Sequence, residues 1–401
     1  MNVSEMLKSL QDPMGVPFYP FVFQILLVLT FALHIIFVNL VIGGSFMAVY
    51  SYFRTGKYYR SLSKTFARAT TINLSLTIVL GVAPLLFVQV VYDPFWYTSN
   101  VLSASWMIGI LFVLMLAFSF AYVFYLKSYK EKQRIAIWGI LSFSLIILAA
   151  IIMHTISYQA LLPEKWFGWY VNNNKVNLYG AQLHAFQLPR FFHFVVASFA
   201  LTGIFMMLYS WYFWKREDID NSYIVWVGKT GAKIALIFTL LQMIDGVWWL
   251  LSLPVNFHFY TNYIFLISVS VAVILLLVLI KAQSDPERYA LPLAMIAMIN
   301  VLAMSSLREV LRMLYVGRYN YSLYNYKLNI SYGSTALFLV SFVMGIIIVG
   351  YMTTVVFKMG RSSKPVDLSS LKLRAWSVYL MIAWLLMMIV IGLTITVNHI
   401  Q

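Results

Sequence analysis

Ten long apolar runs constrain this chain more than any other feature of its sequence. A helix needs about 20 apolar residues to cross a bilayer, whereas a membrane barrel strand needs only about ten residues of alternating polarity. The runs therefore predict an all-α, polytopic transmembrane bundle within one membrane domain covering 1–401, with an amphipathic N-terminal segment at 1–17 and the helical bundle at 18–398. The predicted spans are 18–50, 71–92, 104–126, 135–158, 189–214, 225–252, 258–281, 289–316, 334–358 and 373–398.

Composition makes lipid the natural solvent for this chain. Only 10% of the residues are charged and 62% are hydrophobic, whereas a soluble domain has about 25% charged residues. The net charge of +15 would raise the question of nucleic acid in a soluble protein. Here the basic residues form short clusters between apolar runs, which is the pattern of membrane topology, so we expect a lipid bilayer and no nucleic acid.

The basic clusters also predict the orientation of the chain. Of the 28 Lys and Arg residues, 20 fall in five connections on one side of the bundle, which is therefore cytoplasmic. Both termini then face outward from the cell's inner (cytoplasmic) membrane. The clustered residues are Arg54, Lys57, Arg60, Lys64, Arg68, Lys127, Lys130, Lys132, Arg134, Lys215, Arg216, Lys229, Lys233, Lys281, Arg288, Lys358, Arg361, Lys364, Lys372 and Arg374.

The chain contains no cysteine. This excludes disulfides, thiolate ligation of an iron–sulfur cluster and covalent attachment of c-type haem within the chain. Any haem must be held by His, Met or a carboxylate, and any cluster or covalent haem belongs to another subunit.

Four histidines lie in the outer half of the predicted bundle: His34, His154, His193 and His258. Neutral imidazole is the common protein ligand of haem iron. A single histidine of this kind is more often a packed or interfacial residue. Four of them at similar depth on different helices favour a metal site, because a polar side chain in lipid needs a partner. We predict that they bind haem b, in two or three copies.

Charged side chains within the spans are the other candidates. Asp245 is either a proton-transfer group or a hydrogen-bonded packing residue, and Glu309 either ligates iron or transfers protons, or forms a structural ion pair. Arg308 and Arg312 can neutralise Glu309 or bind a haem propionate. Arg190, three residues before His193, can serve a propionate in the same way or extend towards the membrane interface.

Several of these segments resemble subunit I of the cytochrome bd-type quinol oxidases. The first is His34-Ile-Ile-Phe-Val-Asn-Leu-Val-Ile-Gly43, the second runs from Arg190 to Gly203, and the third is Glu309-Val-Leu-Arg312, with Gly246 as a weaker match. The resemblance implies that His34 binds haem of the oxygen-reducing site, His193 binds the low-spin haem b, and Glu309 ligates the high-spin haem b.

The departures from that family are informative. Span 104–126 has no acidic residue where the oxidases supply glutamates, and the connection at 252–257 is too short for a quinol-binding loop. The methionine ligand of the low-spin haem has no clear counterpart, but His258 lies close enough to replace it, and His154 is a candidate second axial ligand. An iron with two histidine ligands is closed and suits electron transfer.

We therefore expect a haem b subunit of a quinol-linked respiratory complex. The resemblance implies electron transfer between menaquinol, or another quinol, and an outward-facing c-type or multihaem cytochrome or iron–sulfur subunit, in contact with other membrane subunits. Two alternatives stay open. One is a terminal oxidase that uses Asp245 and Glu309 as proton donors, and the other is an ion-coupled transporter without a cofactor.

Overall fold

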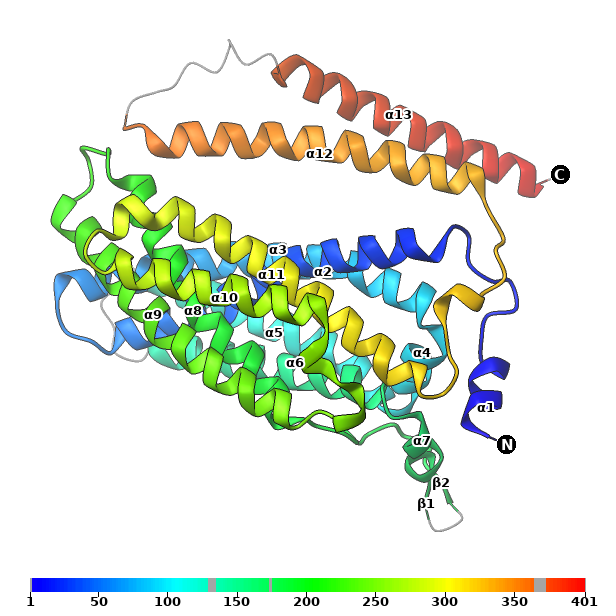
Figure 1. The fold of residues 1–401 in the computed structure, drawn as a ribbon. Coiled ribbons are helices and arrows are strands. Elements are labelled where there is room, and N and C mark those ends of the chain that lie inside the picture. Colours follow the sequence, from blue (N-terminus) through cyan, green and yellow to red (C-terminus); the bar gives the residue numbers. More distant parts are fainter. Residues whose placement is uncertain (1, 129–134, 173–174, 364–372, 401) are drawn as a thin grey trace.

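The computed structural model describes residues 2–128, 135–172, 175–363 and 373–400. Ten helices in this part of the chain are long and apolar enough to cross a membrane, which confirms the predicted polytopic all-α fold (Figure 1). They are α2 (Pro20–Tyr52), α3 (Lys57–Val91), α5 (Ala104–Lys127), α6 (Ala136–Gln159), α8 (Leu188–Phe213), α9 (Asn221–Leu251), α10 (Tyr263–Ala282), α11 (Pro286–Gly317), α12 (Tyr332–Arg361) and α13 (Leu373–Ile400).

The short elements gather at one end of the bundle, which we call the α4 end. They are α1 (Val3–Ser9), α4 (Asp93–Leu102), α7 (Pro163–Tyr170) and an antiparallel hairpin of β1 (Val171–Asn172) and β2 (Lys175–Val176), with 3₁₀ turns at Val255–Phe257, Phe259–Thr261 and Leu323–Asn325. Both chain ends also lie at the α4 end (Figure 1). That this end faces outward stays a prediction from the basic clusters, of which Lys130, Lys132, Arg134, Lys364 and Lys372 lie outside the described residues.

The second span begins earlier than predicted. The basic residues from Lys57 to Arg68, which the sequence predicts in a connection, form the first turns of α3. A helix of 35 residues is about 52 Å long, so α3 extends well beyond a hydrocarbon core of about 30 Å. The extension is helical because Leu62 and Phe66 pack in a buried cluster with Met206 of α8 and Ile224 of α9. Tertiary packing thus continues the helix past its apolar stretch.

The seventh span, in contrast, begins later than predicted. Helix α10 starts at Tyr263, because the side chain of Asn262 accepts hydrogen bonds from the N–H groups of Ile264 and Phe265 and so caps the helix. His258 lies before this cap in a left-handed turn with φ 44°, and it is exposed. The predicted start of the seventh span at His258 is therefore wrong by five residues, because the helix begins at Tyr263.

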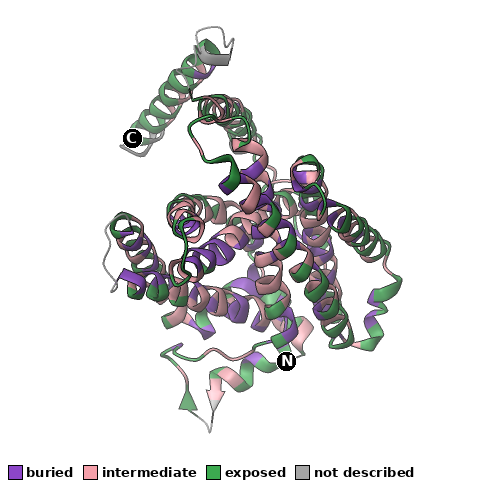
Figure 2. Cartoon of the chain, turned by 90° about the vertical axis from the view of Figure 1, so that its left-hand side faces the viewer, coloured by how far each residue is buried: buried purple, intermediate pink, exposed green. Residues whose placement is uncertain are grey.

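Two helical hairpins, α2–α3 and α8–α9, form the centre of the bundle, and α2 also contacts α6, α8 and α11. A Cβ added at Gly203 of α8 would lie 2.4 Å from the backbone nitrogen of Ala235 of α9, so these two backbones approach as only glycine permits. Buried residues lie between these helices and exposed residues around the perimeter (Figure 2). Helices α12 and α13 pair with each other in a layer beside the bundle (Figure 1).

Two connecting segments cover the α4 end, namely residues 10–19 and 318–331. They run side by side, with the N–H of Val16 donating to the carbonyl of Lys327 at 2.9 Å and the N–H of Asn329 donating to the carbonyl of Val16 at 2.9 Å. This pairing holds the start of α2 next to the end of α11. It therefore positions two helices that carry candidate site residues.

The buried carboxylate of Asp93 ties this cover to the bundle, and its removal tests the cover. Asp93 accepts hydrogen bonds from the backbone N–H of Asp12, at 2.7 Å, and from the hydroxyl of Tyr326.

We expect Asp93→Ala to lower the free energy of unfolding by at least about 2 kcal/mol, because two donors lose their acceptor away from water. Burial raises the pKa of Asp93, so neutral Asp93→Asn, which keeps an acceptor, should lose much less. Thermal unfolding in detergent measures both. Equal losses in the two variants would contradict this role.

Candidate haem-binding site

His193 of α8 is held by Asp245 of the neighbouring helix α9. The Nδ1 of His193 lies 3.0 Å from Oδ2 of Asp245, and the two side chains are 13% and 9% exposed. A carboxylate accepts a hydrogen bond from Nδ1–H, and this tautomer leaves the lone pair of the imidazole on Nε2. The ring packs over Gly246, where an added Cβ would lie 3.4 Å from its Cε1, and the ring of Trp249 lies 5.0 Å away.

His34 of α2 is held in a similar way by its hairpin partner α3. Its Nδ1 lies 3.1 Å from the backbone carbonyl oxygen of Thr77, which can only accept a hydrogen bond, so the lone pair is again on Nε2. One helical turn further along α3, a Cβ added at Gly81 would lie 2.9 Å from Cε1 of His34. The imidazole therefore rests directly on the backbone of α3. Histidines that ligate metals are usually oriented by such a hydrogen bond at the other ring nitrogen.

The other two histidines have different surroundings. The Nε2 of the buried His154 accepts a hydrogen bond from the backbone N–H of Gln187 at 3.3 Å, and the ring packs on Phe186 with centroids 4.7 Å apart. Because this hydrogen bond occupies the Nε2 lone pair, His154 fits the role of a packed histidine and not that of an iron ligand. His258 lies exposed in its turn. Within the described residues, no three His, Asp or Glu side chains are close enough to hold a metal ion together, so the predicted histidines do not form one cluster.

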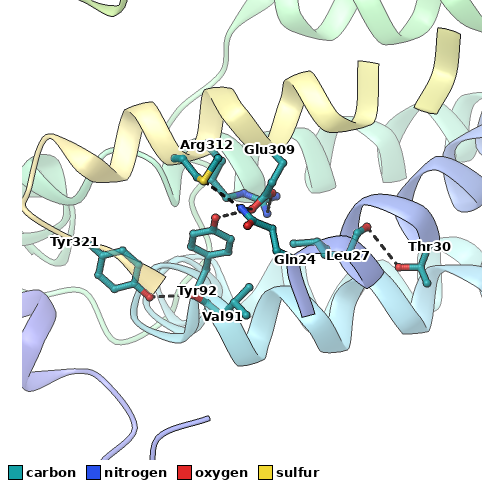
Figure 3. A network of polar contacts seen from close by, with 9 residues as sticks. Gln24, Leu27, Thr30, Val91, Tyr92, Glu309, Arg312 and Tyr321 are labelled. Carbon is teal, nitrogen blue, oxygen red and sulfur yellow. Dashed lines mark hydrogen bonds and ion pairs between the residues drawn. The ribbon is translucent and has the colours of Figure 1, made fainter. Parts of the chain in front are cut away.

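Glu309 of α11 has hydrogen-bond partners at both of its carboxylate oxygens (Figure 3). Its Oε1 accepts from the hydroxyl of Tyr92 at 2.5 Å and from the amide of Gln24 at 3.3 Å, and its Oε2 pairs with Nη1 of Arg312 at 2.8 Å. The guanidinium of Arg312 also lies 4.9 Å from the centre of the Tyr92 ring. This is the arrangement of the structural ion pair, one of the two roles that the sequence left open for Glu309.

Two further arginines lie close to this pair. Arg190 of α8 is 6% exposed, with its guanidinium 5.7 Å from the ring of Tyr158, and Arg308 lies 4.0 Å above the ring of Phe31. Among the described residues, neither forms an ion pair with a carboxylate.

Arg190 and Arg308 interact electrostatically with Arg312, and Arg308 does so with Glu309 as well. We call Arg190, Arg308 and Arg312 the arginine group. Three guanidinium groups against one carboxylate leave two positive charges inside the bundle. An unpaired charge removed from water is costly, so this arrangement is typical of a site that receives an anion.

The arginine group interacts electrostatically with two of the predicted histidines, Arg308 with His34 and Arg190 with His154. Arg190 also precedes His193 by three residues, which is about one turn on the same face of α8. Guanidinium groups therefore accompany the oriented His34 directly and the oriented His193 along its own helix.

No protein-family model matches this chain, and no curated protein matches it either. The case for its chemistry therefore rests on the site itself.

Sequence reasoning missed the residues that orient the candidate ligands. Thr77 contributes a backbone carbonyl and Gly81 contributes only space, and neither role has a signature in a single sequence. Tyr92 and Gln24, which bind Glu309, carried a weak signal as polar groups at the ends of apolar runs. Many interfacial residues share that signal, so it does not identify these two.

Proposed function

We propose that this protein is a haem b-binding electron-transfer subunit of a quinol-linked respiratory complex in the cytoplasmic membrane. One observation carries the proposal: His34, with its Nε2 lone pair available, interacts with a buried arginine group that carries an excess of two positive charges, and the second oriented histidine, His193, lies one turn from Arg190 on α8. Haem b combines an iron that binds imidazole with two carboxylate propionates. The site offers a partner for each part.

His34 and His193 would each ligate the iron of one haem through Nε2, and the arginine group would bind propionates. When bound, haem b supplies one-electron transfer. The protein contributes the orientation of the imidazoles, through Thr77 and Asp245, and the positive charge that retains the anionic groups.

Orphaned polar atoms next to both histidines support this fit. Ten buried side-chain polar atoms among the described residues have no hydrogen-bond partner, and Nε1 of Trp249 and Oγ1 of Thr77 are two of them. Each of these two belongs to a residue that touches one of the two oriented histidines. A group bound next to these histidines would give both atoms a partner.

The surroundings of Glu309 favour an electron conduit over an oxygen-reducing centre. Its two oxygens are engaged by Tyr92, Gln24 and Arg312, so it is not poised to ligate iron. The apolar α5 adds no acidic proton donor. We propose that electrons pass between a membrane quinol, such as menaquinol, and an outward-facing c-type, multihaem or iron–sulfur subunit at the α4 end.

Spectroscopy of the purified protein tests this function. We expect a reduced-minus-oxidised difference spectrum with a b-type α-band and two haems per chain, one on each oriented histidine. A preparation folded in detergent but without haem absorbance would refute the proposal and favour the transporter. Cyanide-sensitive oxygen uptake driven by a quinol would favour the terminal oxidase.

A further inference from the structure

The segment that joins α6 to α8 carries large apolar side chains that no other described residue covers. The exposed fractions are 73% for Phe167, 79% for Leu178 and 83% for Tyr179. These residues lie on α7 and just after the β1–β2 hairpin, within the described residues 163–172 and 175–180, which we call the α7 segment. The segment is not loosely attached, because Trp166 is 3% exposed and its Nε1 donates to the carbonyl of Gln159 at 2.9 Å.

Hydrogen bonds to the first turn of α5 set the level of this segment along the bundle. The hydroxyl of Ser105 donates to the carbonyl of Tyr179 at 2.6 Å, and the indole N–H of Trp106 donates to the carbonyl of Ala181 at 2.8 Å. Helix α5 is a membrane-spanning candidate from Ala104 onward. Tyr179 therefore lies where the apolar part of α5 begins, which is the boundary between lipid tails and headgroups.

The α7 segment projects sideways from the bundle. Figure 1 shows α7 and the hairpin projecting away from the helices near the α4 end, and Figure 2 shows the strands beyond the outline of the bundle. Helix α5, to which the segment is tied, exposes Ile108, Leu111 and Phe112 by 62% each, as expected of a lipid-facing helix. A segment that projects sideways at this level extends over the lipid headgroups.

We infer that the α7 segment is a membrane-interface anchor, with Phe167, Leu178 and Tyr179 inserted among the headgroups and upper acyl chains of the leaflet at the α4 end. Aromatic residues are enriched at this depth, and lysines near it reach the lipid phosphates. Lys165 and Lys175 are exposed on the same segment. This inference concerns lipid contact only and does not depend on the proposed electron transfer.

Single-cysteine labelling in lipid nanodiscs tests the anchor, and the absence of native cysteine makes each label unique. Leu178→Cys carries an environment-sensitive fluorophore. Glu217→Cys, in an exposed polar connection, is the aqueous control, and Leu111→Cys on α5 is the control for deep lipid. Two kinds of quencher are used. Iodide quenches labels that are exposed to water, and lipids that carry a nitroxide near the headgroup or near the end of the acyl chain quench labels at those depths.

We expect the label at Leu178 to be quenched at least about threefold more strongly by the headgroup-proximal nitroxide than by the distal one, and to be shielded from iodide, because interfacial segments insert about 5–10 Å. The label at Leu111 should prefer the deeper nitroxide and the label at Glu217 should respond to iodide. If the label at Leu178 behaves like that at Glu217, the anchor does not exist. If iodide reaches the label at Leu178 in nanodiscs but not in native membranes, a partner protein covers this surface, and the inference is equally overturned.

Discussion

His193→Ala is expected to abolish haem binding at the α8–α9 hairpin. The imidazole is the proposed iron ligand there, and alanine leaves Asp245 without its partner at 3.0 Å. The haem-to-protein ratio and the b-type absorbance of the purified variant measure the loss. Imidazole added to the buffer should restore part of the absorbance, because it can occupy the vacated position, whereas a merely misfolded variant would not respond.

His154→Ala is the matched control for that experiment. It removes a histidine of similar burial whose Nε2 is already used by the N–H of Gln187. We expect it to keep its haem and to lose only packing stability. Asp245→Asn should weaken haem binding by about 10–100-fold without abolishing it, because the orienting hydrogen bond persists while its charge is lost. Equal haem loss in the His154 and His193 variants would show that the assignment of the Nε2 lone pairs is wrong.

Gly81→Val is expected to empty the second site while leaving the first one intact. A Cβ at this position would already lie 2.9 Å from Cε1 of His34, and the two methyl groups of valine fill the space of the imidazole itself. The ring must leave the Thr77 carbonyl that holds it. We expect the haem content to fall to about half if each oriented histidine holds one haem. Potentiometric titration of the remaining haem should follow a single component.

Gly109→Val provides the control for valine within a membrane-spanning helix. A Cβ added at Gly109 of α5 meets nothing within 4 Å, so this variant changes the residue type without displacing a side chain. It should keep the full haem content and the same thermal unfolding as the original protein. Gly81→Val with unchanged haem would contradict the assignment of His34 as a ligand. The elution volume of the Gly81→Val variant in size-exclusion chromatography shows whether α2 and α3 still pack.

The sequence predicted the spans well because a bilayer imposes a strong and local requirement. Ten apolar runs became ten long helices, and the errors concern only their ends. Helix α3 begins at Lys57 because Leu62 and Phe66 find partners on α8 and α9, and α10 begins at Tyr263 because Asn262 caps it. Both helix starts depend on tertiary contacts or capping hydrogen bonds, which a hydropathy profile does not contain.

The candidate site was only partly accessible from sequence. The residue types that carry chemistry stood out, because charged and imidazole groups are rare in this apolar chain and costly in lipid. Their roles did not stand out. His34 and His154 look equivalent along the chain, yet the first presents Nε2 and the second uses it within the fold.

By itself, then, the sequence determined that this is a polytopic helical membrane protein, with ten helices in the described part of the chain long enough to span a bilayer, and which few polar side chains must find partners inside it. Only the tertiary structure decided which partners they find. His34 meets a carbonyl 43 residues away and His193 a carboxylate 52 residues away, each on the adjacent helix of a hairpin. The physical reason is that apolar length acts within one segment, whereas the proton on an imidazole is placed by whatever group a second helix brings against it.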